Sequence, residues 1–590
     1  MARNTYGVDE KLDQPFNWKS FKRAGKYIGR YKKQMIISLI LSAVASASEL
    51  LNPRITEYAL DHAIPDGNIK QLVLLVIALA GCFAVFIALS TIRQRIMTEV
   101  GQNIIYDIRK DLFAHLQKLP FSYYDNRPQG KILIRVVNYV NSVSNMLSNG
   151  LLNVVLELIN MVFVMIFMFT LSPRLSLIIL AGVPVLAGVM IAMKKAQRRN
   201  WQNVSNKSSN MNAYLQENLT GARVTKIFAR EEENSEIFED LADKHRKAWI
   251  KAVRINNIVW PVTDTVSVSV RAAIYIIALA VLGPSAVPVG MILAMTTYAF
   301  RFWMPIMNLS NLYNDFINNI AYLERIFETM DEPVDVDDAP DATEMKPIIG
   351  EVEFKDVCFA YEDDKPVLKN VSFKVNPGQS VALVGPTGAG KSTIVNLISR
   401  FYNVGSGQVL VDGVDISGVT LHSLRSQMGI MMQDSFLFTG TIADNIRYGR
   451  LDATDEELRE AAKTVQADGF ISQMPDGYNT EVNERGSSFS QGQRQLISFA
   501  RTFVSSPKIL VLDEATSSID VRTERDLQKG LNELLKGRTS FIIAHRLSTI
   551  KNCDIIMYID DGMIKEAGSH EELMEKKGLY YKLYTSQSIA

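Results

Sequence analysis

The nine residues GPTGAGKST at positions 385–393 follow directly on the apolar run VALV at 381–384 and decide the fold of the C-terminal half. An apolar run, a glycine-rich turn and a helical pattern predict a strand that leads through a phosphate-binding loop into a helix. The glycines let backbone N–H groups turn toward a polyphosphate, Lys391 supplies a charge for its outer phosphates, and Ser392 offers a hydroxyl to Mg²⁺. The residues of this P-loop that we expect to bind a nucleotide are Gly385, Pro386, Thr387, Gly388, Ala389, Gly390, Lys391, Ser392 and Thr393.

A second apolar run, ILVL at 509–512, ends in the carboxylates Asp513 and Glu514. A nucleotide hydrolase needs such groups beside the phosphates. We expect Asp513 to hold Mg²⁺ directly or through water, and Glu514 to polarise the attacking water as the general base.

Composition divides the 590 residues into two unlike halves. Apolar runs long enough to cross a bilayer recur up to about residue 299, whereas charged residues are interleaved throughout the sequence beyond about residue 331. We expect an N-terminal cytoplasmic or interfacial segment over 1–34, a transmembrane domain over 35–330, a linker over 331–347 and a nucleotide-binding domain over 348–590. The 63 basic and 63 acidic side chains balance, and no large basic patch interleaved with aromatics occurs, which argues against a nucleic-acid partner.

The hydropathy pattern predicts six membrane spans, at 35–59, 72–92, 143–171, 175–193, 255–282 and 287–306. Basic residues between positions 19 and 33 place the N-terminus in the cytoplasm, so the protein is expected to be a multi-pass cell-membrane protein with a cytoplasmic C-terminal domain. The long charged loops at 93–142 and 194–254 then reach into the cytoplasm as helices. Each has a turn near its middle, at 120–130 and 210–221. We expect the parts of these turns around 123–126 and 214–216 to dock onto ATPase domains near Gln433 and Glu484.

Further motifs give the sequence a specific resemblance. From about residue 348 the chain resembles the nucleotide-binding domain of ABC transporters, and the six-span half resembles the membrane domain of their exporters. The resemblance implies that Tyr361 stacks on adenine, that Gln433 touches Mg²⁺ and senses the membrane domain, and that His545 contacts the γ-phosphate. The segments 480–486 (TEVNERG) and 517–520 (SSID) also match the family. The implied fold is an all-α six-helix transmembrane domain with long cytoplasmic helical extensions, followed by an α/β P-loop ATPase domain that uses ATP and Mg²⁺.

The signature motif departs from the family pattern. Where the family usually has LSGGQ, this chain has Phe489, Ser490, Gln491, Gly492 and Gln493. In the family this segment caps the γ-phosphate of ATP bound to the P-loop of the other subunit. Ser490 and Gly492 keep that contact available, whereas Gln491 adds bulk and removes backbone conformations open only to glycine. The alternative is that this loop position tolerates the change.

The resemblance implies a half-transporter that works as a dimer, which exports small hydrophobic or amphipathic compounds of the multidrug type across the membrane. A complete catalytic set beside an altered signature favours a heterodimer with a second ABC half-transporter, as in heterodimeric bacterial multidrug exporters, and the segment 578–587 is also similar to that group. A homodimer with two equally slow sites is the alternative. Other functions on this scaffold are a homodimeric lipid flippase, a peptide exporter, or an ATP-gated channel or regulator; Glu514 and His545 argue against the last of these.

Several ionisable residues fall within the predicted spans, where hydrocarbon penalises an unpaired charge. They are Glu49, Glu157, Asp264, Arg271 and Arg301. One alternative is that they form interhelical ion pairs, or that an arginine near the interface extends its charge out of the hydrocarbon. The other is that Glu157 or Asp264 lies along a substrate path and favours cations. In the same way, methionine and aromatic residues of the last span form either an adaptable substrate wall or ordinary packing and lipid contacts. They are Met291, Met295, Phe302, Trp303 and Met307.

Overall fold

The computed structural model describes residues 18–125, 127, 129–280, 288–362, 365–431, 435–483, 486–513, 521–543 and 550–589. The chain forms two compact units. One comprises Met1–Gln117 and Gln129–Asp331, and the other comprises Lys118–Pro128 and Glu332–Ala590. A short segment of the first long loop therefore belongs to the C-terminal unit.

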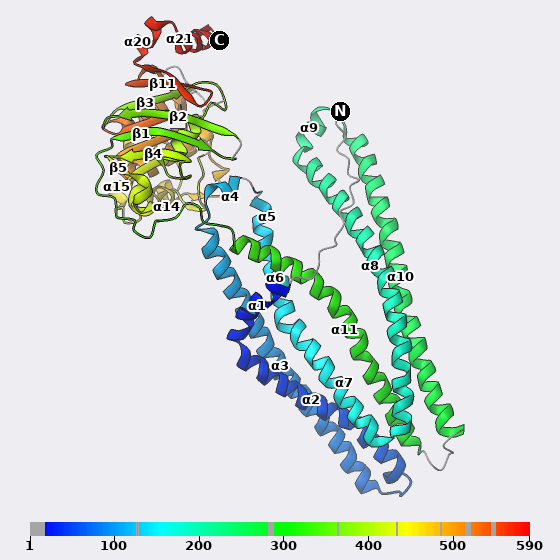
Figure 1. Cartoon of the computed structure of the whole chain (residues 1–590). Helices are drawn as coiled ribbons and strands as arrows, with labels where there is room; N and C mark the ends of the chain where they lie inside the picture. Colours follow the sequence, from blue (N-terminus) through cyan, green and yellow to red (C-terminus); the bar gives the residue numbers. More distant parts are fainter. Residues whose placement is uncertain are drawn as a thin grey trace. The chain divides into compact units, whose positions relative to one another are not determined.

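The N-terminal unit is helical (Figure 1). Its α-helices are α1 (Trp18–Arg30), α2 (Lys32–Tyr58), α3 (Ile69–Leu116), α5 (Gln129–Ile134), α6 (Val140–Asn145), α7 (Leu151–Leu171), α8 (Pro173–Thr220), α9 (Ala222–Ile227), α10 (Glu231–Ala280) and α11 (Val289–Met330). Three π-helical turns continue them, η1 (Ala59–Ala63), η2 (Arg135–Tyr139) and η3 (Met146–Gly150). With 48 residues in α3, 48 in α8 and 50 in α10, these helices are far longer than the roughly 20 residues that span a bilayer, so each extends beyond it.

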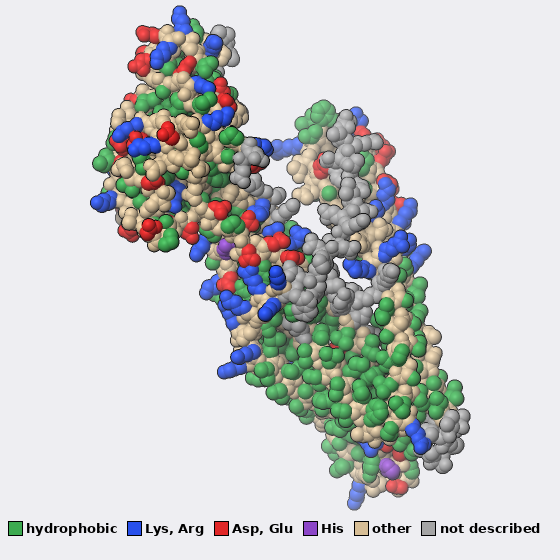
Figure 2. All heavy atoms as spheres, in the orientation of Figure 1, with side chains coloured by type: hydrophobic (Ala, Val, Ile, Leu, Met, Phe, Trp, Pro, Cys, Tyr) green, Lys and Arg blue, Asp and Glu red, His purple; other side chains and the backbone are tan. Residues whose placement is uncertain are grey.

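Five helical stretches of the described residues are long and apolar enough to cross a membrane, at Lys32–Ala63, Ile69–Leu116, Ile132–Leu171, Pro173–Thr220 and Val289–Ile306. The predicted span at 255–282 falls in the C-terminal part of α10, which carries Asp264 and Arg271. It is helical over its described residues but is not among the five. Apolar side chains gather on the lower part of this unit in Figure 2, and charged ones on the upper parts of α8 and α10.

The turn expected at 210–221 was placed too early. Residues 210–220 are the last part of α8, and the chain turns only after Gly221, through α9, to Ala229 with a φ of 49°. No glycine or proline occurs between 210 and 220, so nothing in that polar stretch ends the helix. The helix α4 (Phe121–Asp125) does lie in the turn predicted at 120–130.

Over its described residues, the C-terminal unit contains three sheets. A six-stranded sheet has the order β12-β11-β3-β10-β9-β6, a four-stranded sheet has the order β2-β1-β4-β5, and β7 pairs with β8. The strands are β1 (Val352–Ala360), β2 (Pro366–Val375), β3 (Ser380–Val384), β4 (Ser406–Val411), β5 (Val414–Asp415), β6 (Met428–Met431), β7 (Gly440–Thr441), β8 (Glu481–Val482), β9 (Ile509–Asp513), β10 (Thr539–Ile543), β11 (Ile555–Asp560) and β12 (Met563–Gly568). In the six-stranded sheet β3, β6, β9, β10 and β11 pair in parallel, so the carboxyl ends of β3 and β9 share one edge.

Side chains of the six-stranded sheet alternate between two cores. Val381 and Leu383 of β3 pack with the four-stranded sheet and α12, whereas Ala382 and Val384 pack with the helices on the other face. The α-helices of this unit besides α4 are α12 (Lys391–Ile398), α13 (Leu421–Arg425), α14 (Ile442–Arg447), α15 (Asp455–Thr464), α16 (Asp468–Ile471), α17 (Gln491–Val504), α18 (Val521–Leu535), α20 (His570–Lys576) and α21 (Leu579–Ile589).

Candidate functional site

The P-loop leaves the carboxyl end of β3 and enters α12 at Lys391. Gly385 has a φ of 141°, and a Cβ there would collide with the carbonyl oxygen of Ile559 on β11. Gly390, with a φ of 104°, would bring a Cβ within 2.7 Å of Leu368. Gly388 also has a positive φ, but nothing lies within 4 Å of where its Cβ would be. Packing therefore fixes both ends of the loop and leaves its middle open, which suits a backbone that receives phosphates.

Lys391 lies inside this loop. Its Nζ atom donates to the carbonyl oxygens of Gly385 at 2.9 Å and Pro386 at 2.7 Å. Burial lowers the pKa of the Lys391 ammonium, and the charge of Asp513 at the end of β9 opposes that change. The sheet therefore brings the two predicted phosphate-side residues together, although their roles stay predictions.

Ser392 and Thr393 lie in the first turn of α12, with Ser392 exposed and Thr393 buried. Ser392 at the N-terminus of α12 and Asp513 at the end of β9 offer the hard oxygen ligands that Mg²⁺ prefers. Among the described residues, no group of three or more His, Cys, Asp or Glu side chains could hold a metal ion by itself. This donor set fits an ion that takes most of its ligands from phosphates and water.

The predicted adenine-stacking residue, Tyr361, follows β1 and is 48% exposed. Its ring meets Phe359 edge-on at 4.8 Å and Tyr402 edge-on at 5.0 Å. Its hydroxyl lies 3.2 Å from Thr393 Oγ1 and accepts from Asn396 Nδ2 at 3.3 Å. Tyr361 is therefore held against the helix that begins at the P-loop, with part of its surface left open.

The signature segment forms the start of α17. Ser490 is its N-cap: the hydroxyl accepts from Gln493 N at 3.2 Å, and Gln493 Oε1 accepts from Ser490 N at 2.9 Å. Gln491 is the first helical residue and does not have a positive φ, and Gly492 is buried. The backbone at position 491 therefore has no need for glycine, and only the bulk of the side chain distinguishes Gln491 from the family pattern.

Other predicted site residues lie outside the described residues. They are Gln433, Glu514 and His545, together with Glu484 as a predicted docking position. Their roles stay predictions from the sequence.

The predicted docking of the first long loop can be followed in part, because Lys118–Pro128 and Glu332–Ala590 form one unit. In α4, the Phe121 ring lies 4.2 Å from that of Phe401, and Asp125 Oδ2 accepts from the Tyr402 hydroxyl at 2.6 Å. Sequence reasoning did not identify Phe401 or Tyr402, because neither belongs to a nucleotide motif. They lie three and four residues beyond the end of α12, and this position close to the P-loop helix is the feature of the sequence that could have pointed to them.

In the transmembrane unit the charged residues have partners. Arg301 lies 3.1 Å from Glu49, and Arg271 lies 3.7 Å from Asp264 on the same helix. Asn308 Nδ2 donates to Glu157 at 2.7 Å. Of these two ion pairs, only Arg301–Glu49 joins two helices, α11 and α2, and corresponds to the ion-pairing alternative of the sequence analysis. Arg271–Asp264 lies within α10, and the partner of Glu157 is a neutral amide.

The methionine and aromatic residues singled out in the last span are packed, as far as the structure describes their side chains. Met295, Phe302 and Trp303 belong to one buried core, and Met291 packs against it. The ordinary-packing alternative describes them in this structure.

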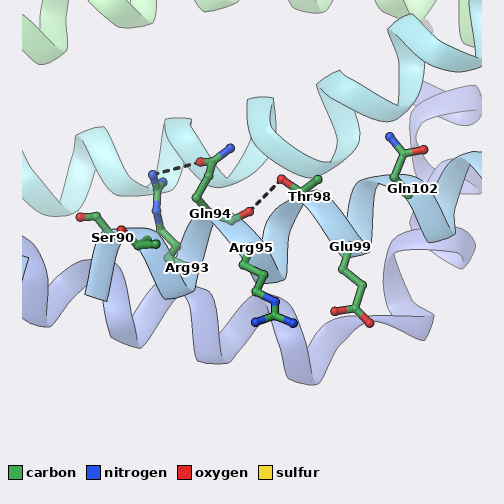
Figure 3. A pocket seen from close by; sticks show the side chains of 8 residues that line it. Ser90, Arg93, Gln94, Arg95, Thr98, Glu99 and Gln102 are labelled. Atoms are coloured by element: carbon green, nitrogen blue, oxygen red, sulfur yellow. Dashed lines mark hydrogen bonds between the residues drawn. The ribbon is translucent and has the colours of Figure 1, made fainter. Parts of the chain in front are cut away.

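A shallow cavity of about 780 Å³, open to solvent, lies along residues 90–102 of α3 (Figure 3). Gln94, Thr98 and Gln102 point to one side of the helix, and Arg95 and Glu99 to the other. The side chains that line the cavity are polar or charged, and the charged ones include both arginine and glutamate.

Comparison with known proteins places these features in context. Residues 35–306 match the family described as "ABC transporter transmembrane region", and residues 368–517 match the family described as "ABC transporter". The chain is 40% identical over its whole length to an uncharacterized ABC transporter ATP-binding protein, YknV, of Bacillus subtilis, of which it covers 98%. It is 37% identical to a putative multidrug export ATP-binding/permease protein, YgaD, of the same organism, with 96% of this chain and 99% of that protein covered.

Two further similarities extend this comparison. A fatty acid ABC transporter ATP-binding/permease protein of Mycobacterium bovis is 38% identical, with 83% of this chain and 78% of that protein covered. The solved structure of a bacterial Atm1-family ABC exporter with ATP bound is similar at a TM-score of 0.79 and 29% identity, and covers 94% of this chain and 98% of its own.

Proposed function

The chain belongs to the ABC transporter family, with a transmembrane domain fused to an ATPase domain, and from that premise we propose that it exports small hydrophobic or amphipathic compounds as one half of a heterodimer. The fold class predicted from the sequence is confirmed: a helical transmembrane domain precedes an ABC ATPase domain. The chain is an ATP hydrolase coupled to transport, and it lies in the membrane with its ATPase domain in the cytoplasm.

The proposed binding and hydrolysis of ATP rest on the P-loop. Backbone N–H groups of the open loop and the Lys391 ammonium would hold the phosphates, while Ser392 and Asp513 would hold Mg²⁺. Mg²⁺, when bound with ATP, neutralises charge on the phosphates. Glu514 follows Asp513 directly in the sequence, and its proposed role is to accept a proton from the attacking water.

The heterodimer proposal rests on Gln491. P-loop and signature segment serve different nucleotides, so a homodimer would place Gln491 at both sites. A heterodimer would confine Gln491 to the nucleotide site built on the partner's P-loop. The site built on this chain's own P-loop would then be completed by the signature segment of the partner. We expect that partner to carry a regular LSGGQ and a defective catalytic position.

The substrate proposal rests on the charges of the transmembrane unit. Arg301 compensates the charge of Glu49, whereas Glu157 accepts, among the described residues, from the neutral Asn308 amide and keeps a negative charge that suits the polar or cationic end of a compound. The cavity along α3 offers polar groups of both signs beside apolar helix surfaces, which suits compounds with a polar and an apolar end. The relative named for multidrug export supports the same class.

A second candidate is lipid transport, because a relative of comparable identity is named for fatty acids. A fatty acid is also amphipathic, so the polar lining of α3 suits it equally well.

The test is ATP hydrolysis in proteoliposomes that contain this chain alone or with a co-expressed partner half. We expect little activity alone, and stimulation of the pair by amphipathic dyes rather than by fatty acids. Stimulation by fatty acids alone would favour the second candidate. Strong dye-stimulated hydrolysis by this chain alone would contradict the heterodimer.

A further inference from the structure

The junction between α4 and the ATPase domain lies beside the predicted base-binding end of the nucleotide site. Tyr402 contacts both sides: its hydroxyl donates to Asp125 of α4 at 2.6 Å, and its ring meets Tyr361 edge-on at 5.0 Å. Burial and the Asp125 carboxylate raise the pKa of Tyr402 well above its usual range, so the hydroxyl stays a donor. One side chain therefore joins a loop of the membrane domain to the residue expected to stack on adenine.

The helix α12 connects this junction to the P-loop. It begins at Lys391 in the P-loop and ends at Ile398, four residues before Tyr402. Beyond its end, the partly buried Phe401 ring lies 4.2 Å from the ring of Phe121 of α4 and 5.2 Å from the Arg425 guanidinium.

Buried arginine contacts fix the same end of α12. Arg400 is 4% exposed and donates to the carbonyl oxygens of Val419 at 2.7 Å and of Asp337 in the linker at 3.0 Å. Arg425 donates in turn to the Arg400 carbonyl oxygen at 2.6 Å. Because each donor is a desolvated cation, breaking these bonds is costly, and the segment that carries Tyr402 is held in place beside the end of α12.

We propose that Tyr402 is a positioning residue through which α4 controls how tightly Tyr361 holds the nucleotide base. While Asp125 accepts from Tyr402, the Tyr402 ring supports the edge of Tyr361 and keeps its open face fixed. When α4 withdraws, Tyr402 loses that bond, and the base is held less tightly while the phosphate contacts of Lys391 persist. This inference rests on the base-stacking role proposed for Tyr361, and it does not depend on which substrate is exported.

The experiment measures binding of ATP and of inorganic tripolyphosphate to the full-length chain in lipid nanodiscs, by displacement of a fluorescent ATP analogue. Tripolyphosphate carries the phosphates without the base. We expect Tyr402→Phe and Asp125→Ala each to weaken ATP binding by roughly three- to tenfold and to leave tripolyphosphate binding unchanged. Asp125→Asn should largely preserve ATP binding, because its amide oxygen can still accept from Tyr402.

Two comparisons make the test specific. The double variant should be no weaker than either single one, because both remove the same bond. Tyr478→Phe is the matched control, since its hydroxyl donates to Asp468 at 2.8 Å elsewhere in the ATPase domain, and it should bind ATP as the parent does.

Unchanged ATP binding in Tyr402→Phe and Asp125→Ala would overturn the proposal, and so would equal weakening toward ATP and tripolyphosphate. Tyr361→Ala separates the premise from the inference. If that variant also binds ATP normally, the base-stacking role itself is wrong. Failure of dye-stimulated transport would bear only on the proposed substrate.

Discussion

Both terminal nitrogens of Arg127 donate to the Glu332 carboxylate, at 3.0 and 3.1 Å, and this pair links the first cytoplasmic loop to the start of the linker. The same guanidinium lies 4.2 Å from the centre of the Tyr123 ring, whose side chain is buried. Two-pronged arginine–carboxylate pairs hold orientation better than single ones. The pair fixes the loop segment beside α4 to the polypeptide that leads into the ATPase domain.

Breaking this pair should uncouple substrate from hydrolysis. We expect Arg127→Ala to reduce substrate stimulation of ATPase activity by roughly two- to tenfold while basal activity stays near the parent level. The charge-reversed pair Arg127→Glu with Glu332→Arg should restore part of the stimulation. Lys365→Ala, which removes an exposed ion pair with Glu362, is the matched control. Full stimulation in Arg127→Ala would show that the pair has no part in coupling.

Removing the P-loop ammonium should weaken nucleotide binding rather than folding. Lys391→Ala loses the charge that faces the outer phosphates, so we expect ATP affinity to fall at least about tenfold. Lys369→Ala, at a surface ion pair with Asp561, should bind ATP normally. Titration of a fluorescent ATP analogue measures both, and unchanged affinity in Lys391→Ala would refute the assignment of the loop.

Substitutions at Gln491 can separate the effect of its side-chain volume from the effect of losing the backbone conformations that only glycine adopts. Because Gln491 is the first residue of α17 and has no positive φ, alanine should serve there as well as glycine. We expect Gln491→Ala and Gln491→Gly to raise turnover at the partner's P-loop site by similar factors. A gain with glycine alone would mean that ATP binding needs a conformation absent from this structure. No gain with either would favour the view that the change is tolerated.

Close packing at Gly182 predicts a stability effect in the transmembrane unit. A Cβ there would lie 2.7 Å from both Trp303 of α11 and Val270 of α10. We expect Gly182→Ala to destabilise the protein by about 1–3 kcal/mol, as over-packed cores do. Gly188→Ala, on the same helix with nothing within 4 Å of its Cβ, should be neutral or slightly stabilising. Thermal unfolding in detergent compares the two, and equal midpoints would contradict the packing described.

The sequence predicted the P-loop and its strand because glycine spacing and an apolar run are local signals. It also predicted the long cytoplasmic helices, since apolar runs and charge patterns mark where a helix leaves the membrane. It placed the second turn too early, because the polar residues before Gly221 are compatible with helix and only the glycine interrupts them.

Contacts between distant segments could not be predicted from the sequence. Nothing local in the sequence links Asp125 to Tyr402, or Arg127 to Glu332, because each pair depends on how the loop folds onto the ATPase domain. The conformation at Gln491 was equally hidden, since the family pattern alone suggested that glycine was needed there.

The most direct test of the account is ATP-dependent dye uptake into inside-out vesicles that contain this chain with its partner half, compared with the Glu514→Gln pair. We predict that the parent pair accumulates dye only with hydrolysable ATP, and that Glu514→Gln abolishes most uptake and hydrolysis while ATP still binds, because only the water-activating carboxylate is lost. Uptake and hydrolysis by the Glu514→Gln pair at the parent level would contradict the claim that hydrolysis at this chain's own P-loop drives export.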